Sequence, residues 1–201
     1  MSMKRWRERK LVRALKKRDE DAFRELVRVF QHRVFNIVYR IIGDRDEAEE
    51  VSQEVFVAVF KHIDSFRGDS KLSTWLYRIA TNHAKNRVKY LARRKRGRHQ
   101  DIDETPESAV EQTPAGGDAF FRPDQEAIGQ ELHGILREGL QTLSEEHRAV
   151  IVLRDVEGMS YREMSEVLEV AEGTVKSRLY RARVALKEYV ESRYDDVGAP
   201  N

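Results

Sequence analysis

The sequence predicts an all-α protein: two small helical domains joined by a flexible acidic linker. Apolar residues recur at helical spacing before Gly97 and again after Glu126, and no convincing run alternates between apolar and polar residues as a half-buried strand would. Between these two stretches lie three of the four prolines and the pair Gly116-Gly117, in an acidic segment without an apolar period. Such a composition is typical of a flexible tether.

Five segments follow from this division. They are a basic N-terminal extension (1–19), a first helical domain (20–97), the linker (98–125), a second helical domain (126–192) and a disordered tail (193–201). With 201 residues in total, neither domain is large enough to bury a large hydrophobic core. We therefore expect small modules that are stabilised by binding a partner. The extension is interpreted either as an added DNA contact or as a solubilising arm.

The first domain begins with two helices whose boundary is visible in the sequence. An apolar stripe runs from Phe23 to Ile41 and stops at Gly43. Asp44 followed by Glu47 has the form of an N-cap with a returning carboxylate. A second helix is therefore predicted to begin at this point.

The remaining helices are placed by their capping residues. After a loop, Ser73 or Thr74 is expected to cap a third helix, and in the second domain an apolar stripe ends at Leu143, where Ser144 caps the next helix. Residues 150–153 favour a strand by propensity. The capped start and the short flanks favour a helix instead.

Residues 159–190 show the pattern of a helix-turn-helix: a short helix, a tight turn and a longer basic helix. Ser160 is expected to cap the short helix, Glu172-Gly173 to form the turn and Thr174 to cap the second helix. The outer face of that helix offers side chains suited to phosphates and base edges, namely Thr174, Lys176, Ser177, Arg178, Tyr180, Arg181 and Arg183. The alternative is an amphipathic hairpin whose basic face is merely solvated.

The net charge of +2 conceals three blocks of charge. Residues 1–18 hold nine basic residues and one acid, residues 85–98 hold eight basic residues and no acid, and residues 101–126 hold eight acids and one arginine. Such blocks favour polyanion-binding surfaces separated by an acidic tether. Taken singly, each block could also be a solvated helix face.

Several classes of protein are disfavoured. Without cysteine there are no disulfides or thiolate metal sites, the six histidines show no metal-binding spacing, and no glycine-rich phosphate loop or nucleophile elbow occurs. We therefore expect no enzyme, no metal and no cofactor. The basic N-terminus lacks the apolar stretch of a secretory signal, and the longest apolar run, Val55 to Phe60, is too short to cross a bilayer. A cytoplasmic protein without membrane insertion is expected.

Three motifs together resemble one family. Residues 172–183 (EGTVKSRLYRAR) are similar to the minus-thirty-five recognition helix of sigma-70 family factors. Residues 44–56 (DRDEAEEVSQEVF) resemble the family's polymerase-gripping region, and residues 73–82 (STWLYRIATN) its strand-opening region. Because no third domain intervenes, the sequence is identified as a member of the small extracytoplasmic function (ECF) group. The resemblance implies a sigma region 2 bundle followed by a region 4 helix-turn-helix.

The resemblance also implies a polymerase contact on the helix that begins after Asp44. In the family this helix binds the coiled coil of the largest polymerase subunit. Carried over to this sequence, the contact residues are Glu50, Gln53, Glu54 and Phe60. The alternative reading is a solvated acidic face.

A second implied site reads the minus-ten element. Opening a promoter needs planar surfaces and polar side chains for an extruded base. The expected DNA contacts are Phe66, Tyr77, Arg78, Asn82, Lys85 and Asn86. Asn82 and its neighbours would read the non-template base, and Lys85, Arg87 and Lys89 would hold phosphates. Trp75 is expected in the core, and Phe66 either in the core or stacked on a base.

The predicted function is that of an alternative sigma factor for a stress or envelope-response regulon. Its partners would be core RNA polymerase, promoter DNA as duplex and as melted non-template strand, and an anti-sigma factor. The linker would either thread the polymerase near its active site or act as a plain tether. The main alternative, a free-standing helix-turn-helix regulator, leaves the strip around Glu50 and the cluster around Asn82 without a purpose.

Overall fold

The computed structural model describes residues 3–100 and 127–197. Within these two ranges the chain is helical and forms no strand, which confirms the all-α prediction. Most of the expected linker and the end of the expected tail lie outside the described residues. Helix α4 extends into the first part of that linker, to Gln100, and α8 extends into that tail, to Val197.

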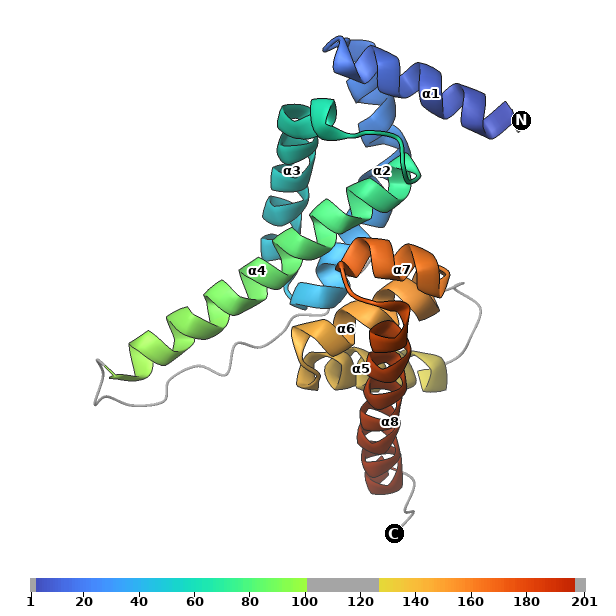
Figure 1. The fold of residues 1–201 in the computed structure, drawn as a ribbon. Helices are drawn as coiled ribbons and strands as arrows, with labels where there is room; N and C mark the ends of the chain where they lie inside the picture. Colours follow the sequence, from blue (N-terminus) through green and yellow to red (C-terminus); the bar gives the residue numbers. More distant parts are fainter. Residues whose placement is uncertain (1–2, 101–126, 198–201) are drawn as a thin grey trace.

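Three helices form the first bundle (Figure 1): α2 (Glu20–Ile42), α3 (Arg45–His62) and α4 (Leu72–Gln100). Their apolar faces meet in a core in which the side chains of Ile37, Val55 and Leu76 are fully buried. Burying such a side chain contributes about 1.5–3 kcal/mol. Trp75 is also in this core, as predicted.

The boundary between α2 and α3 matches the sequence prediction in two of its three details. Gly43 ends α2 with a φ of 87°, a left-handed conformation that glycine adopts without strain. The side chain of Asp44 accepts a hydrogen bond from the backbone N–H of Glu47 at 2.9 Å. The predicted return of the Glu47 carboxylate is wrong, because that carboxylate pairs with Arg87 of α4 instead.

Most of the segment 1–19, which was expected as an extension, is helical and adds a fourth helix to the first bundle. Its residues form α1 (Met3–Lys16), which packs against α2 and against the short 3-10 helix η1 (Ile63–Ser65). Leu15 is fully buried in that contact. The sequence did not predict this helix because basic residues surround its few apolar residues and obscure the helical spacing.

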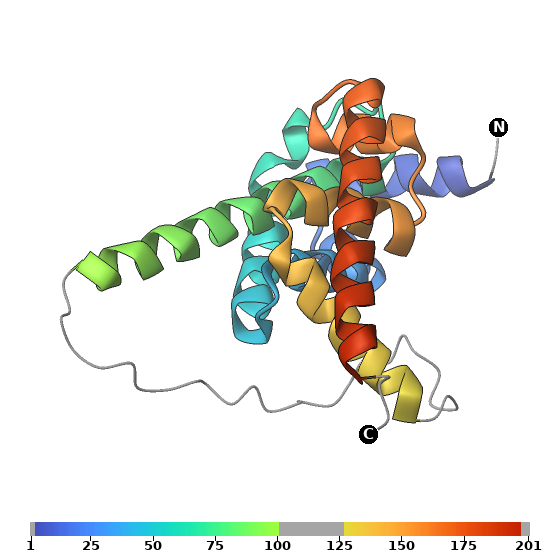
Figure 2. The same cartoon turned by 90° about the horizontal axis from the view of Figure 1, so that it is seen from below.

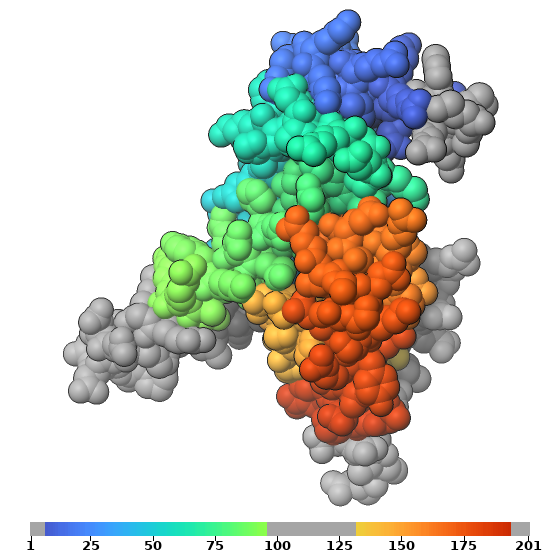
Figure 3. Space-filling view, in the orientation of Figure 1, coloured from blue at the N-terminus to red at the C-terminus, as the bar shows by residue number. Residues whose placement is uncertain are grey.

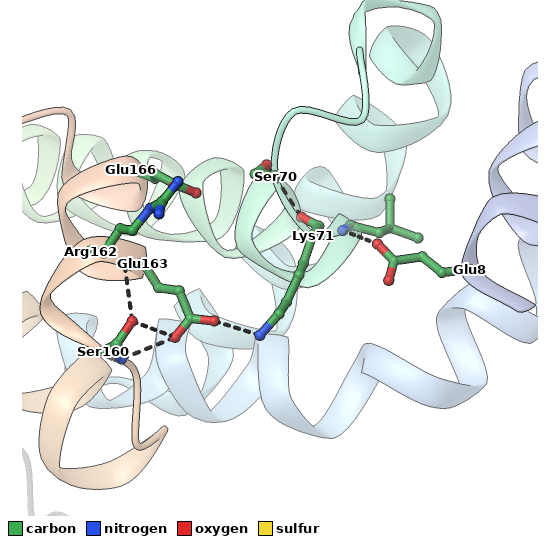
Figure 4. A network of polar contacts seen from close by, with 8 residues as sticks. Glu8, Ser70, Lys71, Ser160, Arg162, Glu163 and Glu166 are labelled. Carbon is green, nitrogen blue, oxygen red and sulfur yellow. Dashed lines mark hydrogen bonds and ion pairs between the residues drawn. The ribbon is translucent and has the colours of Figure 1, made fainter. Parts of the chain in front are cut away.

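The start of α4 depends on a residue from α1. The helix begins at Leu72, whose backbone N–H donates to a carboxylate oxygen of Glu8 at 2.6 Å (Figure 4). The expected caps, Ser73 and Thr74, are therefore wrong: both lie inside the helix, and Thr74 is buried. The carboxylate of Glu8, more than 60 residues away in the sequence, thus accepts the hydrogen bond that a local capping residue would otherwise accept.

The second bundle consists of α5 (Ala127–Thr142), α6 (Glu145–Ile151), α7 (Tyr161–Leu168) and α8 (Glu172–Val197). A π-helical turn, η2 (Val152–Val156), continues α6. Residues 150–153 are thus helical, as predicted.

The capping predictions of this bundle hold at two serines and fail at the turn. Ser144 caps α6, and Ser160 caps α7 in a reciprocal capping box with Glu163. The turn before α8 begins at Glu169, which has a φ of 56°. Glu172 already belongs to α8, so Thr174 is inside that helix rather than at its cap.

The two bundles pack directly on each other, with α7 against α4 and with α5 and α6 against α2 (Figures 1, 2 and 3). Arg148 of α6 is buried in this interface, where its guanidinium donates to the backbone oxygens of Ile41 at 2.6 Å and Leu143 at 3.0 Å. Gln141 adds a bond to the backbone oxygen of Arg40 at 3.3 Å. The carbonyl end of α2 is therefore satisfied by side chains of the other bundle.

Candidate polymerase and nucleic-acid interfaces

The outer face of α3 carries exposed acids, as predicted. The side chain of Glu50 is 63% exposed and that of Glu54 46% exposed, and Gln53 between them is also exposed. Phe60 lies near the end of the same helix. It is an exposed aromatic side chain whose ring stacks at a tilt on Phe23, with a centroid distance of 4.6 Å.

Arg87 of α4 ties these carboxylates together. Its guanidinium lies 2.5 Å from a carboxylate oxygen of Glu47, 2.8 Å from one of Glu50 and 2.8 Å from one of Glu54. Hydrogen bonding to Arg87 lowers the pKa of Glu50, and these carboxylates in turn raise the pKa of Arg87. Arg87, which was expected to hold DNA phosphates, here directs Nη1 and Nη2 to three carboxylates of α3.

The residues expected to read the minus-ten element divide into two groups. Asn82 and Asn86 are exposed on α4 and Lys85 is half-buried, so their polar ends reach the surface. Phe66 and Tyr77, by contrast, lie in the core, which corrects the expectation that they lie open to a base.

Aromatic packing explains both burials. The ring of Phe66 packs on Trp75 at a centroid distance of 5.4 Å, and that of Tyr77 meets the ring of Phe30 edge-on at 6.4 Å. Burial raises the pKa of the Tyr77 hydroxyl, and the nearby guanidinium of Arg33 opposes that shift.

A pocket of about 370 Å³ opens beside this cluster. It is formed by the loop before α4, by the first turns of α4 and by one carboxylate of α7. Its lining residues are Ser65, Phe66, Arg67, Gly68, Asp69, Ser70, Thr74, Trp75, Arg78 and Glu166. The loop and Arg78 therefore face a hollow, and the second bundle closes one side of it.

Carboxylates of the second bundle engage cations of α4 and of the loop before it. The ammonium of Lys71 lies 2.7 Å from Glu163 (Figure 4), and Arg78 lies 3.3 Å from Glu169. Hydrogen bonds from Lys71 and from the backbone and hydroxyl of Ser160 together lower the pKa of Glu163 to about 2. In this arrangement the predicted DNA contact Arg78 has a protein carboxylate as its partner.

The outer face of α8 presents most of its predicted contacts to solvent. The exposed residues are Lys176, Ser177, Tyr180, Arg181 and Arg183. Thr174 is only partly exposed. Arg178 lies 3.2 Å from Glu146 with its side chain 23% exposed, and Arg183 pairs with Asp155. Buried Val175 and Leu179 hold the opposite face of α8 on the core.

Sequence reasoning missed three residues that shape these surfaces: Glu8, Arg148 and the clamping role of Arg87. Each acts on a partner at least 30 residues away or on another element. No local pattern marks such a residue, although a lone acid among nine basic residues was a signal at Glu8.

Within the parts of the chain that the structure describes, none of the helices combines the length and the apolar character needed to span a membrane.

Comparison with known proteins decides the family. The sigma-70 region 2 family matches residues 26–96, and the sigma-70 region 4 family matches residues 133–186. The chain is 37% identical to the ECF RNA polymerase sigma-E factor of Escherichia coli, over 90% of this chain and 93% of that protein. The chain belongs to the ECF sigma factors.

Other relatives of this ECF sigma factor agree. It is 34% identical to the RNA polymerase sigma-H factor of Pseudomonas aeruginosa, over 92% of this chain and 94% of that protein. It is 33% identical to the ECF RNA polymerase sigma factor SigW of Bacillus subtilis, over 90% of this chain and 95% of that protein. The family consists of transcription initiation factors rather than enzymes.

Solved structures show the same fold. CnrH, in a complex with the cytosolic domain of CnrY, matches 92% of this chain and 97% of its own with a TM-score of 0.65 and 22% sequence identity. The sigma factor RpoE from Bartonella quintana, in a complex with the anti-sigma factor NepR, matches 84% of this chain and 96% of its own with a TM-score of 0.60 and 28% identity.

Proposed function

We propose that this ECF sigma factor binds core RNA polymerase through α3, reads the minus-ten element through α4 and the minus-thirty-five element through α8. It thereby starts transcription of a stress or envelope-response regulon in the cytoplasm. One observation supports the proposal most: an exposed acidic face and an exposed basic face occur on separate helices of one chain of this family.

The α3 face suits a basic protein partner. Glu50, Gln53 and Glu54 are exposed on one helix. An anionic face attracts a cationic surface on a partner and accelerates their encounter. The largest subunit's coiled coil is the proposed partner, and Phe60 would add apolar contact area at the end of the helix.

The α8 face suits the major groove of duplex DNA. Lys176 and Arg181 are exposed and donate hydrogen bonds, and a helix fits the width of the groove. Arg or Lys can bond the O6 and N7 atoms of guanine, and phosphate contacts fix the register. We assign Tyr180 and Ser177 to the same contact.

The α4 surface would act only once the two bundles separate. Asn82 and Asn86 are exposed, but Arg78 is paired with Glu169 of the second bundle. Exposed ion pairs of this kind contribute little, about 0–1 kcal/mol each, so DNA phosphates can replace the carboxylate. A gap between bundles would also free the pocket beside Phe66 for an extruded base.

An anti-sigma factor is the proposed inhibitor. CnrH and RpoE, which share this fold, were each solved with a protein partner, CnrY and the anti-sigma factor NepR respectively. We propose a partner of the same class for this chain, one that holds the promoter-reading surfaces out of reach. The acidic segment 98–125 stays a predicted tether or polymerase-threading element.

Charge reversal on α3 tests the polymerase contact. The double variant Glu50→Lys and Glu54→Lys should fail to co-elute with core RNA polymerase on gel filtration, while its circular dichroism matches that of the parent. Reversal at Glu20 and Asp21, two exposed acids of α2, is the matched control and should leave co-elution intact. Co-elution of the α3 variant at parental yield would contradict the assignment.

A DNA-binding experiment separates the sigma factor from the free-standing regulator. The sigma factor should bind promoter duplex weakly alone and tightly with core polymerase. A free-standing helix-turn-helix protein would bind a paired site by itself, usually as a dimer. Tight binding without polymerase would favour that alternative.

A further inference from the structure

Three acidic side chains share one face of α3 and depend on a single cation. Glu47, Glu50 and Glu54 are spaced three and four residues apart, so they are neighbours on the helix surface. Like charges at this spacing repel one another. Within the described residues, Arg87 is the basic side chain that contacts all three.

The side chain of Arg87 is largely buried at this position. Its side chain is only 15% exposed, although it lies on a helix whose neighbouring basic residues, such as Arg93 and Arg94, are exposed. A planar guanidinium has five N–H donors in a fixed fork and can bond several carboxylates at once, whereas an ammonium is a point charge on a flexible stem. The site therefore uses the specific geometry of arginine.

Arg87 does not neutralise the three carboxylates completely, so this face keeps a negative charge that a basic partner can bind. One guanidinium against three ionised carboxylates gives this face a net charge of about −2. Glu47 lies deepest, with 27% of its side chain exposed, while Glu50 and Glu54 remain 63% and 46% exposed. The two outer carboxylates are thus held by Arg87 and still open to solvent.

We propose that Arg87 is a positioning residue of the polymerase-binding surface: it fixes Glu50 and Glu54 in the orientation that a basic partner helix meets. This inference rests on the proposed function of α3. Holding flexible side chains in place before binding removes the entropy cost of ordering them in the complex. Arg87 acts through the two carboxylates and need not touch the polymerase.

A neighbouring histidine completes the arrangement. The Nδ1 atom of His83 lies 3.5 Å from the second carboxylate oxygen of Glu54. Glu54 is therefore approached from two sides by α4, through one oxygen by Arg87 and through the other by His83. Glu50 pairs with Arg87 alone among the described residues, so the effect of removing Arg87 should be larger at Glu50 than at Glu54.

The test measures the affinity of the full chain for core RNA polymerase by fluorescence anisotropy. Arg87→Gln should weaken binding about tenfold, the loss expected when two side chains must be ordered on binding. Arg94→Gln, which removes an exposed charge from the same helix, is the control and should bind within about twofold of the parent. Parental affinity for Arg87→Gln, or tighter binding, would overturn the inference.

A double-mutant cycle separates positioning from a merely structural role. If Arg87 acts through Glu50, Arg87→Gln should cost about tenfold in the parent but under about threefold in a Glu50→Gln background. Equal losses of affinity in both backgrounds would mean that Arg87 only holds α4 against α3 and does not act through Glu50. That result would overturn the proposal.

Arg87→Lys keeps the test usable if Arg87→Gln unfolds. Lysine retains the charge but cannot bridge three carboxylates, so we expect a folded protein with affinity between those of the parent and of a Glu50→Gln variant. Parental affinity for Arg87→Lys would show that charge alone suffices, against the proposal. If instead the Glu50→Lys and Glu54→Lys double variant still binds polymerase, the proposed function of α3 itself fails. If that variant loses binding while Arg87→Gln does not, only the inference about Arg87 fails.

Discussion

The two proposed nucleic-acid surfaces of this sigma factor differ in which protein groups already contact their basic side chains. On α8, Lys176 and Arg181 face solvent, although Arg178 and Arg183 of the same helix pair with carboxylates of the second bundle. On the first bundle, Lys71 and Arg78 are paired with carboxylates of α7, and Arg87 is enclosed by carboxylates of α3. A basic residue in the sequence is therefore not equivalent to a free basic residue in the fold.

This difference would give the two proposed DNA-reading surfaces separate controls. The α8 face is available in the described arrangement, whereas the α4 surface is covered in part by α7. The contact between the bundles includes these ion pairs, the buried guanidinium of Arg148 and apolar side chains of both bundles that share one core.

The largest effect is expected from charge reversal on the open surface. Lys176→Glu with Arg181→Glu should lower promoter-dependent transcription at least about 100-fold, since each lost base or phosphate contact costs about 1–3 kcal/mol and reversal adds repulsion. Thermal unfolding should stay near the parental temperature because both side chains are exposed. Lys187→Glu, farther along α8, is the control. Transcription at the parental level would remove α8 from promoter recognition.

On the partly covered surface, Asn82→Ala should slow promoter opening by about 1–3 kcal/mol, or roughly 5- to 150-fold, as for a lost base contact. Permanganate reactivity of the unpaired thymines measures the opening. Polymerase affinity should not change, because Asn82 lies on α4 and not on the α3 face. An unchanged opening rate would refute the assignment.

The contact between the bundles can be broken at Arg148. Arg148→Met should lower the free energy of unfolding by about 1–3 kcal/mol, because the backbone oxygens of Ile41 and Leu143 lose buried donors. Urea denaturation followed by circular dichroism measures this loss. Small-angle X-ray scattering should also show a larger radius of gyration. A variant as stable and as compact as the parent would show that the two bundles do not depend on this residue.

The smallest effect is a pH dependence of the ion pair between Lys71 and Glu163. The pKa of Glu163 is lowered to about 2 from an ordinary 4.5, so the pair stabilises the contact fully above about pH 4.5 and is lost as the pH falls toward 2. Because Lys71 is 69% exposed, salt should weaken the pair as well. Fluorescence transfer between dyes on the two bundles should report this change in the parent. Glu163→Gln should reduce the pH dependence, and the pair between Arg78 and Glu169 should account for part of what remains.

Local signals in the sequence were sufficient for most of the fold. Gly43, Asp44, Ser144 and Ser160 were each predicted as helix boundaries and act as such. Capping and left-handed turns depend on residues within one helical turn, so they can be read from a short window.

The candidate sites were harder to predict because their environment comes from distant segments. Tyr77 looked available for DNA, but burial against α2 removes it from the surface. Arg87 looked like a phosphate ligand until α3 supplied its three carboxylates. The start of α4 was misplaced for the same reason, since Glu8 belongs to α1. Helix propensity and apolar periodicity describe neighbouring residues only, so they cannot predict contacts between distant segments.

Run-off transcription with purified core RNA polymerase on genomic fragments tests the central claim most directly. The account predicts discrete start sites that appear only when this protein is added, each preceded by shared minus-thirty-five and minus-ten sequences. Loss of these transcripts with the α8 charge reversal would link them to Lys176 and Arg181. If core polymerase gave no specific transcript with the folded protein, or the same transcripts without it, the account would be contradicted.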